Sequence, residues 1–191
     1  MADDDDLIGL VLDDAAEKMD KAVAHARQEF STVRTGRAAP ALVEKLPVEY
    51  YGADTPLQQL ASFTVPEARQ LLITPFDKST IGAIEKALQQ SDLGLNPSND
   101  GHAIRLSFPP LTAERRKEFV KLVKNMAEEG KITLRNHRRA ARNELESMKK
   151  ESELSEDELK RYEADLDKRI HAHEADIDSA FAVKEKELLE D

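Results

Sequence analysis

Apolar residues recur every three or four positions along the first part of the chain. They begin at Ile8 and continue through Met19 and Phe30 to Val33. An α-helix brings residues three and four apart onto one face, so this spacing predicts one long amphipathic helix. Four acids, Asp3 to Asp6, precede it, and acids near the positive N-terminal end of a helix are favourable by up to ~1 kcal/mol. We interpret this acidic run as a solvated helix start and not as a metal site.

Two further stripes with the same period follow in the last third of the chain. Thr112 is a candidate N-cap for the first, which runs from Phe119 to Met148, and the second runs from Leu159 to Leu188. Ser155 and Glu158 precede the second stripe with the spacing of a capping box. Each helix would reach about 50 to 60 Å, and a lone amphipathic helix leaves its apolar stripe exposed. The three predicted helices should therefore pack as a bundle of long antiparallel helices.

Between residues 36 and 110 the pattern changes, and all eight prolines of the chain lie in this segment. The short runs LPVEYY, LASFTV, LLITPF and AIRLSF are rich in β-branched and aromatic residues, which predicts strands. Residues 77–92 place Ile81, Ile84 and Leu88 at helical spacing, which predicts one helix packed on the sheet. The expected fold class is α+β: a three-helix bundle of residues 1–35 and 111–191 with an inserted small β/α/β sandwich domain of residues 36–110.

The composition agrees with long helices, since 35% of the residues are charged and 5% are aromatic. The chain has no cysteine, which excludes disulfide scaffolds, cysteine nucleophiles and thiolate metal sites. The apolar run LIGLVL is six residues long and follows acids, so it suits neither a signal peptide nor a membrane span. We expect a cytoplasmic protein with no membrane partner.

Charge is unevenly distributed in this chain of net charge -10. Residues 115–150 hold twelve Lys and Arg against five Asp and Glu, whereas residues 151–191 hold fifteen acids and six bases. The stretch RNHRRAAR at 135–142 contains four arginines. At about 100° per residue, with Leu134 as zero, these arginines lie between about 40° and 140° around the helix. They therefore follow one flank beside the core-facing side.

Three interpretations of this arginine flank are open. The first is a solvated face whose partners are acids on the third helix. The second is a surface for structured RNA, because guanidinium groups bind phosphate through paired hydrogen bonds while the acidic remainder of the chain would repel loosely bound nucleic acid. The third is a helical scaffold or chaperone-like module that binds acidic protein partners.

No motif for covalent chemistry is found. The phosphate-binding patterns GxxxxGK[ST] and GxGxxG do not occur in the sequence. The stretch HAHE contains His171 and His173, but residues two apart on a helix face different sides, and His173 falls on the apolar stripe. We expect no catalytic residues, no metal site and no cofactor.

Five short motifs carry a family resemblance. They are RTGRA at 34–38, VEYYG at 48–52, DLGLNP at 92–97, PPLTAERR at 109–116 and RNHRR at 135–139. In this order and spacing the chain closely resembles the ribosome recycling factors over nearly its whole length. The resemblance implies an L-shaped protein of transfer-RNA-like dimensions, expected to be a monomer, with the two domains joined by a flexible hinge.

The resemblance also implies a function. Such a factor binds the post-termination ribosome and, with elongation factor G and GTP, splits it into subunits and releases it from mRNA; it is not itself an enzyme. The residues expected to bind large-subunit ribosomal RNA are Lys131, Arg135, Arg138, Arg139 and Arg142. The residues expected to form the hinge are Arg34, Thr35, Gly36, Arg37, Pro109 and Pro110.

Two features depart from the family pattern. The acidic leader MADDDD is not part of it, and its role stays open. The third position of RNHRR is usually aliphatic in the family, whereas here it is His137 on the predicted core stripe. We expect the packing beside Arg138 to differ for this reason.

Overall fold

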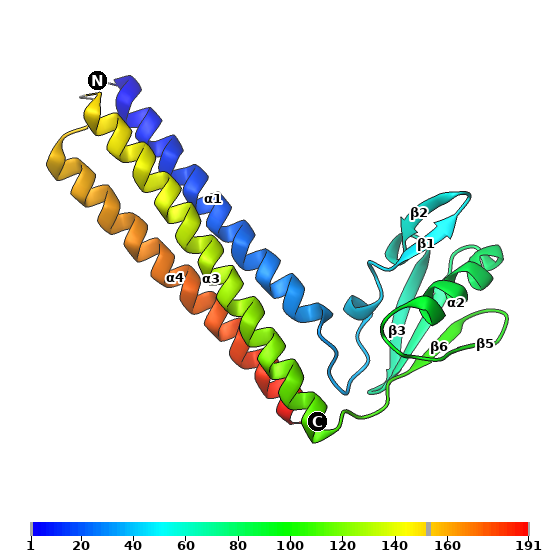
Figure 1. The fold of residues 1–191 in the computed structure, drawn as a ribbon. Helices are drawn as coiled ribbons and strands as arrows, with labels where there is room; N and C mark the ends of the chain where they lie inside the picture. Colours follow the sequence, from blue (N-terminus) through cyan, green and yellow to red (C-terminus); the bar gives the residue numbers. More distant parts are fainter. Residues whose placement is uncertain (1, 152–153, 191) are drawn as a thin grey trace. The chain divides into compact units, whose positions relative to one another are not determined.

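The computed structural model describes residues 2–151 and 154–190, with side chains from residue 7 onward. Its contacts separate two units. The first unit consists of Met1–Phe30 and Val120–Lys186, and the second of Ser31–Phe119 with Glu187–Asp191. The first contains most of three long helices and the second contains the strands, which confirms the predicted α+β class (Figure 1). The boundaries predicted at residues 35 and 110 stay a prediction.

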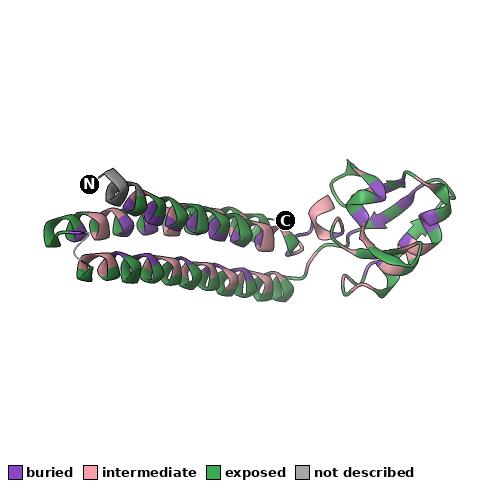
Figure 2. Cartoon of the chain, turned by 90° about the horizontal axis from the view of Figure 1, so that it is seen from above, coloured by how far each residue is buried: buried purple, intermediate pink, exposed green. Residues whose placement is uncertain are grey.

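The first unit is built from most of α1 (Ala2–Thr32), α3 (Ala113–Lys150) and α4 (Glu156–Leu189), which lie side by side (Figure 1). Buried and exposed residues alternate along each of these helices, as an amphipathic helix requires (Figure 2). The innermost include Met19, Leu134 and Ile177, all fully buried. Asp3 to Asp6 fall in the first turns of α1, and their side chains lie outside the described residues.

Both predicted helix starts of the C-terminal part are confirmed. The Thr112 hydroxyl accepts a hydrogen bond of 3.2 Å from the Arg115 N–H, which caps α3. At the start of α4, the Ser155 N–H donates to Glu158 at 2.9 Å, and the Glu158 N–H donates back to the Ser155 hydroxyl at 3.3 Å. This reciprocal pair of bonds satisfies two backbone groups that a helix end would otherwise leave unpaired.

Gly130 lies where α3 meets both neighbouring helices. A methyl group at this position would stand 3.1 Å from Cδ1 of Ile177 on α4 and 3.3 Å from Cβ of Ala26 on α1. Both distances are shorter than ordinary contacts between carbon atoms. The missing side chain therefore permits the close approach of the three helices.

The second unit has a two-stranded and a four-stranded sheet, and all of its pairings are antiparallel. The strands are β1 (Pro47–Tyr50), β2 (Ala53–Pro56), β3 (Ala61–Glu67), β4 (Gln70–Pro75), β5 (Pro97–Asn99) and β6 (Ile104–Ser107). The larger sheet has the order β3-β4-β6-β5. Tyr51 and Gly52 join β1 to β2 with φ values of 49° and 82°, the left-handed pair of a type I′ turn.

Helix α2 (Ile81–Gln90) packs its apolar face into the core of this unit, where Ile84, Ile73 and Leu106 are completely buried. Its start differs slightly from the predicted range of 77–92, because Lys78–Thr80 form a 3-10 turn that the Asp77 side chain caps. The four predicted strands correspond to β1, β3, β4 and β6, and β2 and β5 were not predicted. Their sequences ADTP and PSN consist mostly of turn-forming residues, so they carry no strand pattern.

Candidate nucleic-acid interface

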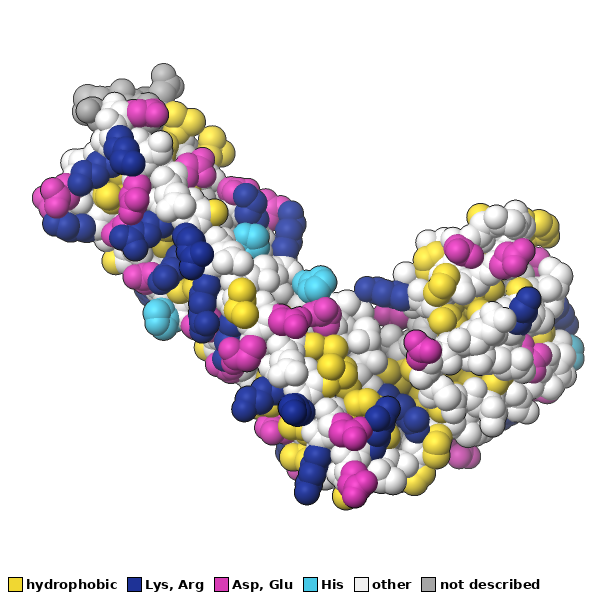
Figure 3. Space-filling view, viewed as in Figure 1, with side chains coloured by type: hydrophobic (Ala, Val, Ile, Leu, Met, Phe, Trp, Pro, Cys, Tyr) yellow, Lys and Arg dark blue, Asp and Glu magenta, His cyan; other side chains and the backbone are white. Residues whose placement is uncertain are grey.

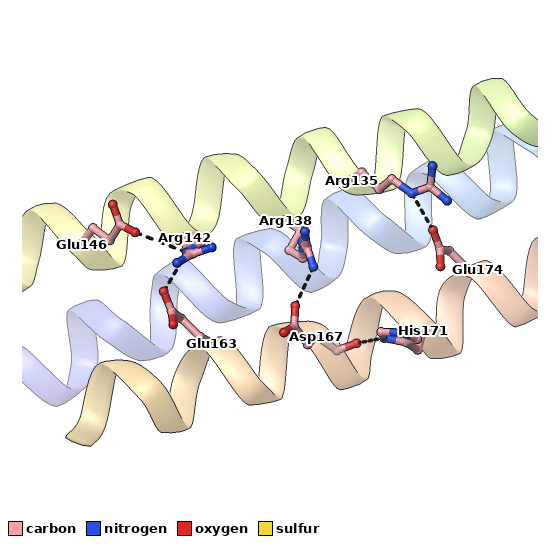
Figure 4. A network of polar contacts seen from close by, with 8 residues as sticks. All are labelled: Arg135, Arg138, Arg142, Glu146, Glu163, Asp167, His171 and Glu174. Atoms are coloured by element: carbon pink, nitrogen blue, oxygen red, sulfur yellow. Dashed lines mark hydrogen bonds and ion pairs between the residues drawn. The ribbon is translucent and has the colours of Figure 1, made fainter. Parts of the chain in front are cut away.

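The arginines of 135–142 lie on the flank of α3 that faces α4. Figure 4 shows Arg135, Arg138 and Arg142 directed toward carboxylates of the neighbouring helix. Arg135 Nε lies 2.9 Å from Glu174, Arg138 Nη1 lies 2.7 Å from Asp167, and Arg142 Nε lies 2.7 Å from Glu163. The structure therefore brings three of the predicted RNA-binding arginines together and gives each an acidic partner.

Lys131 extends the same arrangement by one turn, with its ammonium group 2.5 Å from Asp178 of α4. We call the four cross-helix contacts the ion-pair ladder: Lys131–Asp178, Arg135–Glu174, Arg138–Asp167 and Arg142–Glu163. As the residue number rises along α3, the number of its partner on α4 falls, because the two helices are antiparallel. In the space-filling view, several basic side chains lie close together along the bundle, with acidic side chains beside them (Figure 3).

The arginines of the ladder are well exposed, and this limits the strength of the pairs. Their side chains are 51%, 40% and 54% exposed at Arg135, Arg138 and Arg142. Exposed ion pairs contribute about 0 to 1 kcal/mol each, because water screens the attraction and two long side chains lose freedom. The pairs therefore orient the guanidinium groups, but they are weak enough for an outside anion to replace the α4 carboxylates.

Lys131 is held more firmly, since its side chain is only 15% exposed. The hydrogen bond that its ammonium group donates to Asp178 raises the pKa of Lys131, and partial burial opposes this shift. Of the five predicted RNA-binding residues, Lys131 is thus the least available to an outside partner.

Arg139 differs from the other predicted arginines, because it is exposed and forms no ion pair with any described residue. Within the described part of the chain, Lys150 at the C-terminal end of α3 shares this property, and so do three lysines nearer its start: Lys117, Lys121 and Lys124. At about 100° per residue these three fall between about 80° and 140° from Leu134, on the same flank as the arginines. Sequence reasoning missed them, although their spacing of four and three residues was the available signal.

His137 does not lie within the core as its position in the stripe suggested. It is half-buried and lines a groove of about 390 Å³ with residues of α1 and α3, among them Lys21, His25 and Gly130. A polar ring at the edge of the core keeps access to water. His137 thus lies on the side of α3 that faces α1, at the edge of the core.

The two histidines of HAHE make separate contacts. His171 Nδ1 donates to the Asp167 carbonyl at 2.5 Å. His173 Nδ1 donates to the Arg169 carbonyl at 2.7 Å, and its Nε2 lies 2.9 Å from the Asp20 carboxylate of α1. Among the side chains described in residues 7–151 and 154–190, no three from His, Cys, Asp or Glu are placed to hold a metal ion. No helix in those same ranges is both long enough and apolar enough to cross a membrane.

The predicted hinge residues lie in the second unit, where two of them make contact. Arg34 Nη2 donates a hydrogen bond of 2.6 Å to the Pro109 carbonyl, and its guanidinium lies 5.9 Å from the centre of the Phe108 ring. Burial lowers the pKa of Arg34, and the nearby charge of Arg115 adds to this. The contact ties together the two segments of chain that enter and leave the strand-containing region.

Thr35, Gly36 and Arg37 form a short turn beside this contact. The buried Thr35 hydroxyl accepts a hydrogen bond of 3.2 Å from the Arg37 N–H. Gly36 is buried as well, while Pro110 is exposed. The hinge itself stays a prediction.

Comparison with known proteins gives consistent matches. A family model described as Ribosome recycling factor matches residues 26–189. The ribosome-recycling factor of Cutibacterium acnes is 54% identical over 180 residues, which cover 94% of this chain and 98% of the relative. That of Renibacterium salmoninarum is 56% identical over 177 residues, covering 93% and 96%.

Two solved structures are also similar. A solution structure of a ribosome recycling factor has a TM-score of 0.76 and 38% identity, covering 96% of this chain and 98% of the other. The second describes models of the T. thermophilus ribosome recycling factor and E. coli elongation factor G bound to the E. coli post-termination complex. It has a TM-score of 0.68 and 44% identity, covering 95% and 98%.

Proposed function

This chain belongs to the ribosome recycling factor family, and we propose that it recycles ribosomes after the termination of translation. It binds the post-termination ribosome and, together with elongation factor G and GTP, separates the subunits and frees the mRNA. The observation that supports this most directly is the match over nearly the full length of its relatives. A similar factor has been placed with elongation factor G on a post-termination complex.

The basic flank of α3 is the proposed contact with large-subunit ribosomal RNA. The hydrogen bond of Arg135 to the Glu174 carboxylate uses Nε (Figure 4). A guanidinium group has five N–H donors, so donors remain for a phosphate. We assign the RNA contact to Arg135, Arg138, Arg139 and Arg142, add the unpaired Lys117, Lys121 and Lys124, and give Lys131 a minor part.

The proposed action is mechanical and involves no bond-making by this protein. The energy for separating the subunits comes from GTP hydrolysis by elongation factor G, and the protein acts as a wedge between them. It works in the cytoplasm, where this activity takes place. The segment from Arg34 to Arg37 and the pair Pro109–Pro110 serve as the hinge between a bundle domain of residues 1–35 and 111–191 and an inserted domain of residues 36–110.

The deciding experiment is a subunit-splitting assay on purified post-termination ribosomes. Light scattering should fall when the protein, elongation factor G and GTP are all present, and it should stay constant when any one of the three is left out. Scattering that does not fall with all three present refutes the proposed function.

The RNA contact is tested with the triple variant R135Q/R138Q/R142Q. We expect weaker binding to large subunits and a plot of log affinity against log salt that is shallower by up to about one unit for each phosphate that the variant no longer binds. The matched control K160Q/R161Q/K168Q removes three exposed charges from α4 and should leave this slope unchanged. Equal slopes for both variants and the wild type would contradict the assignment.

The hinge is tested by measuring distances between paired spin labels. Because the chain has no cysteine, N143C and Q89C introduce one label on the exposed surface of α3 and one on that of α2. A broad distribution of distances is expected. A single narrow distance in solution argues against a hinge.

A further inference from the structure

We infer that Glu163, Asp167 and Glu174 of α4 set the RNA selectivity of this protein by competing with phosphate for the arginines of α3. The inference rests on the proposed function, because it concerns the RNA contact of the same arginines. It gives a role to side chains that face the RNA-binding flank but have the wrong charge to bind RNA themselves.

The geometry places a negative charge at every ladder arginine. The three carboxylates lie 2.7 to 2.9 Å from Arg142, Arg138 and Arg135, and each comes from α4. The Glu163 and Glu174 side chains are only 26% and 22% exposed, whereas their arginines are about half-exposed. In these two pairs the acid thus lies on the inner side and the guanidinium group on the outer side, whereas in the third pair Asp167 is 55% exposed and Arg138 40%.

This arrangement weakens the binding of a single phosphate to a ladder arginine. A phosphate that approaches one of these arginines also approaches the carboxylate paired with it, and like charges at such distances repel one another. A flexible RNA strand makes its contacts one at a time and gains little from each. Its attraction to the ladder should therefore be weak.

A folded RNA surface meets different conditions. It presents several phosphates in fixed positions, so it loses little conformational freedom when many contacts form together. The unpaired Arg139, Lys117, Lys121 and Lys124 on the same flank add contacts that no described carboxylate opposes. The exposed ladder pairs exchange partners readily, because screening by water makes each of them weak. The carboxylates therefore lower the affinity for flexible RNA more than the affinity for a structured RNA.

The test compares the wild type with the triple variant E163Q/D167N/E174Q. Each substitution keeps the shape of the side chain and a hydrogen-bond acceptor while it removes the charge. The two probes are a fluorescein-labelled oligouridine and purified large ribosomal subunits. We expect the variant to bind the oligouridine about tenfold more tightly, which corresponds to ~1.4 kcal/mol, and to bind the large subunits with a smaller change.

The salt dependence distinguishes new phosphate contacts from a general change in net charge. Arg142 keeps its second partner, Glu146 of α3, at 3.3 Å. Loss of the three α4 charges should still steepen the plot of log affinity against log salt for the oligouridine by up to about two units, since each contact with a single strand contributes about 0.7. The control D13N/D157N/D176N removes three exposed acids outside the ladder and should leave the slope unchanged. The same slope change in both variants would overturn the inference, as would no gain in oligouridine affinity for the ladder variant.

Two further measurements keep the test decisive. Adding R135Q/R138Q/R142Q to the ladder variant should abolish the gain in affinity, and a gain that persists also overturns the inference. If the triple variant is partly unfolded by circular dichroism, the single variant E174Q should still steepen the slope by about 0.7. Neither measurement uses ribosome splitting, so failure of the proposed function and failure of this inference are separate results.

Discussion

Replacing Gly130 with alanine should destabilise the helical bundle, although alanine is the better helix former. Gly130 lies in the interior of α3, where glycine is less favourable than alanine by about 1 kcal/mol. Against this gain stands the position of the new methyl group. It would stand 3.1 Å from Cδ1 of Ile177 and 3.3 Å from Cβ of Ala26. Ile177 and Ala26 are both buried, with exposures of 0% and 1%, so other protein atoms surround them and resist their displacement.

The magnitude follows from these two opposing effects. Inserting a methyl group into a well-packed core costs about 1 to 3 kcal/mol, and the gain in helix propensity offsets about 1 kcal/mol of this. We expect the free energy of unfolding of G130A to fall by about 1 kcal/mol. Gly9 of α1 is the matched control, because a methyl group there meets no atom within 4 Å. G9A should raise the free energy of unfolding by about 0.5 to 1 kcal/mol.

Urea unfolding followed by far-UV circular dichroism measures both variants, since the long helices dominate this signal. A double-mutant cycle with I177V identifies the contact responsible. I177V alone should cost about 0.5 to 1.5 kcal/mol, but it removes the Cδ1 atom 3.1 Å from the new methyl group. The effect of G130A should then shrink by at least about 0.5 kcal/mol in that background. If G130A instead stabilises the protein as much as G9A does, the close contact of the three helices does not restrict this site.

Three other predictions concern stability. L134A should lower the free energy of unfolding by about 2 to 5 kcal/mol in urea, because Leu134 is fully buried, whereas I132A at a 52% exposed position of the same helix should cost much less. S155A removes the hydroxyl of the capping box at the start of α4 and should lower the free energy of unfolding in urea by about 1 kcal/mol. An unchanged urea midpoint would contradict this prediction. Hydrogen bonds from the backbone N–H groups of Ala103 and His102 lower the pKa of Asp100 from its ordinary value of 3.8. The ionised Asp100 carboxylate therefore stabilises the fold fully above pH 3.8, and this stabilisation is lost as the pH falls through the lowered pKa. A carboxyl NMR titration should give a midpoint below 3.8, and a midpoint at or above it contradicts these bonds.

Much of the fold could be predicted because helices and strands leave different spacings in the sequence. The eight positions of the first stripe, from Ile8 to Val33, are all buried. The stripes of α3 and α4 are correct at Leu134, Leu145 and Ile177, which are fully buried, whereas His137 is half-buried. The strands β2 and β5 were missed because they are short and are held by their neighbours in the sheets. Pairing with another strand is a tertiary contact, so their own sequences need not show it.

The sequence predicted where the arginines of the candidate site lie on α3, but it did not predict which of them form ion pairs. Counting residues placed Arg135, Arg138 and Arg142 on one flank of a helix, and the structure confirms this. The count of acids on the last helix showed that partners were possible, but it could not say which carboxylate faces which arginine. Arg139 and Arg142 are three residues apart, yet only Arg142 has an ion-pair partner among the described side chains.

The sequence by itself determined the three amphipathic helices, the strand-rich insertion, the basic flank and the family, because these depend on local spacing and on motifs that are contiguous in the chain. Only the tertiary structure decided the register between α3 and α4, which pairs Arg135 with Glu174 and leaves Arg139 open. It also decided the place of His137 at the edge of a groove. The physical reason is that ion pairing depends on distances of a few ångströms between residues far apart in the chain, and these distances exist only once the helices have packed.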